Sequence, residues 1–231
     1  MRHRLGGSNV NQMDFKHIFN FLAQLRIHNN RNWFNEHKQE YIKARETFET
    51  FVNALILPLS ELDASIGIVT APECMFRIYR DIRFSPDKTP YKTHMSAFIA
   101  NGGRKTRQAG YYIHLKPGES FVSGGIHSPD AADLESIRQH IYDYPDEIRA
   151  ILDNKSFKTL FPKLMEEDKL KSPPRGYSKE FKEIELIKNR HFVTYHMLDD
   201  EFFMRENLIE RLMQLYKVQY PFNVFLNEAI G

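Results

Sequence analysis

The sequence lacks the features that cross-link a fold, anchor a protein in a membrane or direct its export. Cys74 is the only cysteine among 231 residues, so neither a disulfide within the chain nor a cysteine-based zinc site can form. No stretch approaches 18 unbroken apolar residues, and the polar N-terminus lacks the apolar core of a signal peptide. We therefore predict a cytoplasmic protein that does not associate with membranes.

The chain also has little excess charge. Lys and Arg number 32 against 30 Asp and Glu, which leaves a net charge of +2. This balance excludes a polyanion binder driven by net charge, although a local basic patch is compatible with it. Aromatic residues, in contrast, make up 13% of the chain. A core built from rings explains this content, and an aromatic ligand cage is the alternative.

Helical periodicity at both ends of the chain encloses a central run of strand patterns. Asp14 and Asn32 are predicted to cap two N-terminal helices, and Ser128 a third after the strands. Pro58 is expected to end or kink the second, long helix, and Pro221 to end the last one. Alternation predicts strands over residues 75–84, 94–100, 110–116, 119–126 and 192–197, with a hairpin at Pro117-Gly118.

Helices, then strands, then helices with one late strand indicate an α+β fold. We predict one domain over residues 1–231, with residues 1–12 as a leader outside the fold. Its antiparallel sheet of about five strands would be covered by the N- and C-terminal helices. Gly124-Gly125, inside a predicted strand, indicates a bulge or a close backbone approach.

The densest unusual feature is the basic segment 77–92. A strand here would place Arg77, Tyr79, Asp81 and Arg83 on one face and Arg80 on the apolar face. A buried guanidinium must be paired, so Arg80 needs a carboxylate such as Asp87. One interpretation is a network of ion pairs that only stabilises the fold. The other is an anion site, with these ligand-binding residues: Arg77, Tyr79, Arg80, Arg83 and Lys88.

Candidate catalytic groups lie beside this segment. His114 and His127 are imidazoles that could move protons near neutral pH, with Tyr91 and Asp81 as further candidates. No spacing of histidines and acids typical of a metal site is present, and no nucleotide-binding or serine hydrolase motif indicates a cofactor or reaction. Cys74, next to the arginines, is either a small core residue or a reactive thiol. Whether the protein is an enzyme stays open.

The segment 77–92, together with residues 34–38, 110–114, 123–127 and 171–177, resembles a family of uncharacterised conserved bacterial proteins of about 230 residues. That family is recognised by the motif R-x-x-R-D-x-R-F followed by lysine and tyrosine, and it also occurs within some longer fungal proteins. The matching positions are Arg77, Arg80, Asp81, Arg83, Phe84, Lys88 and Tyr91. The resemblance implies no activity, cofactor or catalytic residue.

Three functions follow from these patterns. The first is a pocket on the sheet that binds a phosphorylated or carboxylated small molecule. The second is a nucleic-acid-binding module that extends the same groove with Arg104, Lys105 and Arg107 and stacks bases on Tyr111 and Tyr112. The third is a non-catalytic interaction protein whose arginine and aspartate motif is structural.

Overall fold

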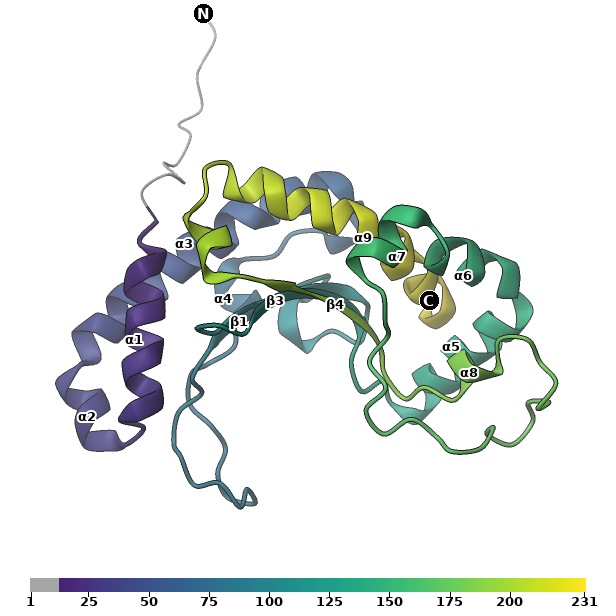
Figure 1. The fold of residues 1–231 in the computed structure, drawn as a ribbon, viewed down its shortest axis with the longest axis horizontal. Coiled ribbons are helices and arrows are strands. Elements are labelled where there is room, and N and C mark those ends of the chain that lie inside the picture. Colours follow the sequence, from purple (N-terminus) through teal and green to yellow (C-terminus); the bar gives the residue numbers. More distant parts are fainter. Residues whose placement is uncertain (1–12) are drawn as a thin grey trace, which may run out of the picture.

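The centre of the molecule is a four-stranded antiparallel sheet, which the computed structural model places among helices (Figure 1). The structure describes residues 13–231, so the predicted leader at 1–12 lies outside the described residues. The strands lie in chain order: β1 (Met95–Ile99), β2 (Gly110–Leu115), β3 (Ser120–Ile126) and β4 (Phe192–Leu198). The predicted hairpin is confirmed, because β2 and β3 pair across Pro117-Gly118.

Helices occupy the chain before, between and after the strands. Before the sheet come α1 (Phe15–Ile27), α2 (Arg31–Glu36), α3 (Lys38–Leu62) and α4 (Ala71–Cys74). Between β3 and β4 come α5 (Ala131–Asp143), α6 (Pro145–Leu152), α7 (Lys155–Leu160) and α8 (Ile184–Ile187), and α9 (Leu208–Ile230) follows β4. Within residues 13–231, short 3₁₀ helices are η2 (Ala64–Ile66), η3 (Gly103–Lys105) and η4 (Asp200–Met204). The predicted mixture of helices and an antiparallel sheet is confirmed.

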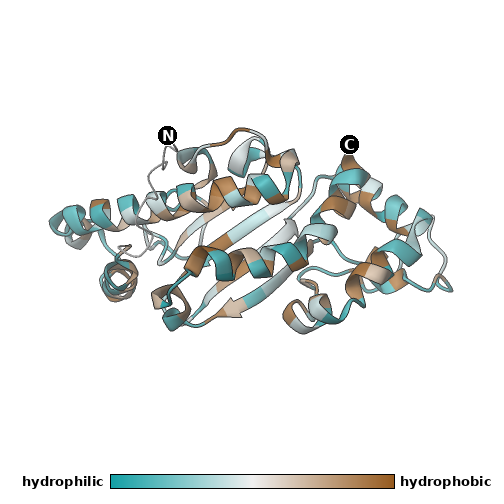
Figure 2. Ribbon diagram, turned by 90° about the horizontal axis from the view of Figure 1, so that it is seen from above, coloured by the Kyte–Doolittle hydropathy of each residue, from teal (hydrophilic) through white to brown (hydrophobic). Residues whose placement is uncertain are grey.

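The two longest helices, α3 and α9, lie side by side over one face of the sheet (Figure 2). The first buried cluster joins α1, α3 and the first half of α9 to the inward side chains of β1 and β2, including Ala97 and Ile113. The second cluster lies under α5, α6 and α7 and contains the second half of α9, including Phe222 and Phe225. Helix α9 therefore contributes to both clusters. That they form one domain stays a prediction.

Several helix ends differ from prediction. Asp14 caps α1 by accepting from the His17 N–H, as expected, but the second helix starts at the Asn30 cap rather than at Asn32. Pro58 and Pro221 lie inside α3 and α9 and end neither helix. Proline removes one hydrogen bond of the helix, and buried residues beyond it, such as Leu59 and Phe222, keep the helix against the core.

The expected strand over residues 75–84 is wrong. Only isolated bridges form there, Met75 with Ala97 and Tyr79 with Tyr91. Residues 76–92, called the arm here, fold back on themselves and project from the sheet (Figure 1). The two limbs pair with each other, because Lys92 N donates to Ile78 O and Arg80 N to Pro90 O. The sheet therefore has four strands rather than about five.

The close approach expected at Gly124-Gly125 is confirmed. A Cβ atom on Gly124 would lie 2.3 Å from the Gln219 Nε2 of α9. One on Gly125 would lie 1.9 Å from the Phe192 carbonyl oxygen of β4, and Gly125 has a φ of +109°. At Gly125 a Cβ would occupy the space of the β4 backbone, whereas at Gly124 it would require the buried end of the Gln219 side chain to shift.

We expect Gly125→Ala to prevent folding or to lower the free energy of unfolding by several kcal/mol, because backbone must move to admit the methyl group. Gly118→Ala is the matched control: its φ is +74°, but no atom lies within 4 Å of the added Cβ. It should cost only about 1–2 kcal/mol of backbone strain. Urea unfolding of both variants compares them, and equal losses would contradict the close approach.

Candidate functional site

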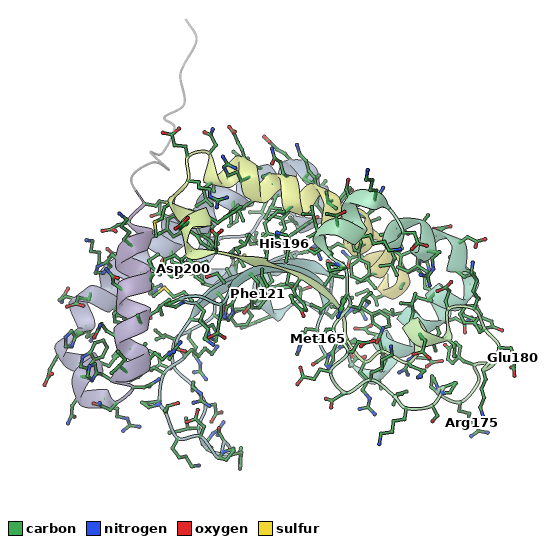
Figure 3. All side chains as sticks on the ribbon, in the orientation of Figure 1. Phe121, Met165, Arg175, Glu180, His196 and Asp200 are labelled. Atoms are coloured by element: carbon green, nitrogen blue, oxygen red, sulfur yellow. The ribbon has the colours of Figure 1, made fainter. Side chains whose placement is uncertain are left out.

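The sheet face opposite α3 and α9 is open and carries rings. Alternation along the strands places these side chains on that face, called the open face here: Phe98, Tyr112, His114, Phe121, Ser123, Tyr195 and Met197. The register agrees, since Tyr112 pairs with Phe98 and Ser123, and Phe121 pairs with His114 and Met197. Figure 3 shows Phe121 on the underside of the sheet, away from the two long helices.

A cavity of about 630 Å³, called the main cavity, lies on this face. Phe98, Tyr112 and Phe121 form its floor, and Phe76 joins them from the base of the arm. Met165 lines the opposite side, where Figure 3 places it at the inner edge of the α5–α8 region. The volume is in the range of small-molecule sites.

Three basic residues after β1 line the same cavity. Arg104 Nη1 donates to the carbonyl oxygens of Pro72 and Glu73, both at 2.7 Å, which fixes its guanidinium. Arg107 donates to the buried Asp133 and to the Ile230 carbonyl. Lys105 is exposed and has no acidic partner among residues 13–231. This segment, called the basic rim here, therefore holds two arginines in place by hydrogen bonds and leaves Lys105 exposed.

A smaller cavity of about 190 Å³, called the edge cavity, adjoins the main cavity. The two share Phe76 and Arg104, so they are neighbours at the β1 edge. Arg77, Tyr79 and Arg45 also line the edge cavity. Of the five predicted ligand-binding residues, the structure brings Arg77 and Tyr79 to a cavity.

The other three serve contacts inside the arm. Arg80 donates to Asp87, to the hydroxyl and carbonyl of Thr89 and to Ser85, so the expected carboxylate partner is confirmed. Arg83 grips Asp81 with two hydrogen bonds, at 3.0 and 2.6 Å. Lys88 donates to the Ile82 carbonyl at 3.0 Å. Arg80, Arg83 and Lys88 line neither cavity.

These bonds explain two pKa shifts. Hydrogen bonds from the Arg83 side chain and backbone hold the pKa of Asp81 below its usual value. The Thr89 N–H, and then Arg80, lower the pKa of Asp87. Both carboxylates therefore stay ionised as arginine partners, which does not suit Asp81 for acid–base work.

His114 lies on the open face, as expected from its position two residues after Tyr112 on the same strand. Its Nδ1 is 3.0 Å from the Tyr112 hydroxyl, and its ring lies 4.2 Å from His94 and stacks on Phe121 at 4.6 Å. Burial, and then the neighbouring cations, lower the pKa of His94 to about 4. Burial, and then His94, lower the pKa of His114 to about 3. Both imidazoles are therefore neutral near pH 7.

His127 lies at the far end of the main cavity and is separate from His114. Its ring stacks on the buried His191 at 4.7 Å, and its Nδ1 is 3.0 Å from the Ser128 hydroxyl. Ser128 N donates to His191 Nδ1, and Ser128 has a φ of +52°. Asp130, not Ser128, caps α5, because its carboxylate accepts from Ala132 N and Asp133 N.

Three further candidates are buried elsewhere. Tyr91 is 5% exposed and stacks on Phe34 with ring centroids 4.0 Å apart, so its ring belongs to the core. Tyr111 is fully buried and donates to Asp63, so it cannot stack bases, unlike Tyr112. Cys74 is also buried, and burial raises the pKa of its thiol to about 11, so it is a core residue.

Sequence reasoning missed the rings of the open face. Phe98, Phe121 and Tyr195 come from three strands, and Phe76 comes from the arm. The sequence did carry a signal for this face. Phe121 and Ser123 are two residues apart and therefore lie on the same side of a strand, as do Tyr195 and Met197. What the sequence did not show is which face the helices cover.

A family model described as "Conserved hypothetical protein (DUF2461)" matches residues 17–225. The chain belongs to this family. No curated protein and no solved structure matches it. The DUF2461 match runs from α1 into α9, so it includes the arm and the open face. The description names no activity, and geometry therefore carries the functional argument.

Within residues 13–231, no helix is both long and apolar enough to cross a membrane. The same part of the chain holds no group of three or more His, Cys, Asp or Glu side chains able to hold a metal ion.

Replacing Arg80 by Gln should loosen the arm. Amide hydrogen exchange over residues 80–92 should rise tenfold or more, since hydrogen bonds to charged groups contribute about 1.5–3 kcal/mol. The melting temperature should change little, because the tip of the arm lies outside both buried clusters. Arg77→Gln, in the same arm, should leave this exchange unchanged. Unaltered exchange in Arg80→Gln would refute the role of Arg80.

Acid should destabilise the protein through the His94–His114 pair. Unfolded histidines bind protons near pH 6.5, whereas the folded ones stay neutral down to about pH 4 and about pH 3. Their contribution is therefore complete above pH 6.5 and is lost as the pH falls, by up to about 1.4 kcal/mol per pH unit for each histidine.

Urea unfolding at several pH values between 7 and 4 measures this slope. His114→Gln should remove about half of the pair's contribution to the slope. The exposed His28 provides the control variant, His28→Gln. The same slope in His114→Gln as in the unaltered protein would show that His114 is not the source.

Proposed function

We propose that the protein binds an anionic small molecule that carries a flat ring, in the main cavity on the open face. The observation that carries this proposal is the joint lining of one cavity by aromatic rings and by three basic side chains, of which Arg104 and Arg107 are held by hydrogen bonds. A phosphate or carboxylate joined to a planar ring, as in a nucleotide, presents both matching chemistries.

The basic rim supports recognition of the anionic part. Arg104 uses Nη1 for the two backbone carbonyls, so Nη2 and Nε are free of partners within residues 13–231. A guanidinium that is already held loses less side-chain freedom on binding. Lys105, next in the chain, adds a mobile ammonium group that can follow the oxygen atoms of the ligand.

The floor supports recognition of the ring. Tyr112 and Phe121 are half-buried and line the cavity, and their ring centroids lie 5.7 Å apart. Half-buried rings are fixed in place by the sheet while keeping exposed surface for stacking. Ser123 and the His127–Ser128 pair add hydroxyl and imidazole groups for hydrogen bonds.

This proposal places the anion site in the main cavity rather than on the segment 77–92, where the sequence predicted it. Arg77 and Tyr79 stay as candidates through the edge cavity, whereas Arg80, Arg83 and Lys88 have partners within the arm. His127 lines the main cavity as a polar group, whereas His114 lines neither cavity. The proposed function is ligand binding, without a covalent step.

Thermal shift and calorimetry with four probes test the proposal: adenosine monophosphate, uridine monophosphate, adenosine and inorganic phosphate. The two nucleotides should raise the melting temperature and bind more tightly than adenosine or phosphate, because each of those carries half of the chemistry. Lys105→Gln should weaken nucleotide binding about tenfold, a loss of about 1.4 kcal/mol.

Lys217→Gln is the charge-matched control, since Lys217 is exposed on α9, which covers the opposite face of the sheet. Phe121→Leu keeps an apolar side chain but removes the ring, and it should weaken binding without unfolding the protein. The proposal fails if no nucleotide binds, or if Lys105→Gln and Lys217→Gln bind equally well.

A further inference from the structure

The rings of the open face continue beyond the main cavity as a row across the sheet. Phe76 lies 6.2 Å from Tyr112, Tyr112 lies 5.7 Å from Phe121, and Phe121 lies 6.3 Å from Tyr195, measured between ring centroids. The row thus starts at the base of the arm and crosses β2, β3 and β4. A single nucleotide has one base, so it would leave most of these rings unused.

The rings also keep flat surface for a ligand. None of the three neighbouring pairs is stacked face to face, because their interplanar angles are 68°, 40° and 68°. One face of Phe121 stacks on His114, which leaves its other face for a ligand. Phe76 is 36% exposed and Tyr195 is 42% exposed, at the two ends of the row. Contiguous exposed apolar surface marks an interaction site, and the arrangement of these rings in a row favours a ligand with repeated planar groups.

Cations accompany this row. Lys92 Nζ lies over the Phe76 ring, 5.3 Å from its centroid. Five basic side chains line the two adjoining cavities: Arg45, Arg77, Arg104, Lys105 and Arg107. Their only acidic neighbours in these linings are Asp130, which caps α5, and Asp133, which pairs with Arg107. Glu49, outside these linings, pairs with Arg45. The two cavities and the row of rings, together called the groove here, therefore keep an excess of basic side chains although the whole chain is nearly neutral.

We propose that the groove binds a single strand of nucleic acid, whose successive bases stack on the row from Phe76 to Tyr195 and whose phosphates meet the basic residues. This inference rests on the proposed function and extends its ligand from one nucleotide to several. Stacking on a row of rings within a basic groove is how proteins bind single strands with little sequence preference.

The architecture favours a single strand over a duplex. Helices α3 and α9 cover one face, and rings occupy the other, a division also used by four-stranded sheets that bind single-stranded RNA. In this protein the order of the strands in the sheet is their order in the chain. The comparison therefore applies to the arrangement of one covered face and one face with rings, and not to the strand topology. Bases in a duplex are already stacked and paired, so they cannot lie flat on rings at the floor of a groove.

Fluorescence anisotropy with a labelled oligouridylate of about ten nucleotides tests the inference, with uridine monophosphate and a duplex of equal length as competitors. The oligonucleotide should bind at least 100-fold more tightly than the mononucleotide, and the duplex should compete poorly. The logarithm of its affinity should fall with the logarithm of the salt concentration, with a slope of about −0.7 for each phosphate contacted.

Tyr195→Ala supplies the decisive variant, because Tyr195 lies in the row but outside the lining of the main cavity. It should weaken oligonucleotide binding about tenfold and leave mononucleotide binding unchanged. Tyr144→Ala is the matched control, since Tyr144 is 47% exposed at the end of α5 and lines neither cavity.

The outcomes separate the two proposals. If uridine monophosphate binds but the oligonucleotide gains nothing, or if Tyr195→Ala has no effect on it, the single-strand inference is overturned and the cavity proposal stands. If the duplex binds as tightly as the single strand, stacking on the row is refuted. If neither the mononucleotide nor the oligonucleotide binds, both proposals fail.

Discussion

The close contact of β3 with α9 and β4 at two glycines is the constraint on which the other features depend. Without side chains at Gly124 and Gly125, the Gln219 side chain and the Phe192 carbonyl occupy space next to the strand. Gln219 then donates to Thr194, and Asn223 donates to the Gly110 carbonyl, so polar groups of α9 bond to the sheet beneath it. This docking fixes which face of the sheet is covered.

Covering one face leaves the other to carry function. The side chains that point away from α3 and α9 are mostly rings, together with Ser123 and Met197. Phe98, Tyr112 and Phe121 among them line one cavity with the basic rim that follows β1. The arm stands at the edge of this face with most of its charges paired internally. The protein therefore has two kinds of arginine. Some, such as Arg80, stabilise a projection, and others, such as Arg104, are held at a cavity.

Local chemistry made much of the fold predictable. The Asp14 cap, the Pro117-Gly118 hairpin and the strands from β1 to β4 depend on neighbouring residues, and these predictions agree with the structure within a few positions. The strand predicted over residues 75–84 was wrong because alternation shows only which side chains would share a face, and not whether another strand is there to pair with. Pro58 and Pro221 do not end their helices, because the burial of apolar side chains before and after each proline outweighs one lost hydrogen bond.

The site was less predictable than the fold. Arg77, Arg80, Arg83 and Lys88 are close in sequence, but the fold turns them toward different partners. Phe76, Tyr112, Phe121 and Tyr195 are distant in sequence, and only the pairing of strands brings them into one row. Strand register and helix docking are long-range properties, which a single sequence does not display.

Helix α9 also has a consequence for the order of events during synthesis. Both buried clusters take residues from α9, the first through Leu212 and Tyr216 and the second through Phe222 and Leu226. A nascent chain that ends before Leu208 can form hairpins and isolated helices, yet it leaves both apolar interiors facing water. Neither interior can close before α9 has left the ribosome, because both contain its side chains.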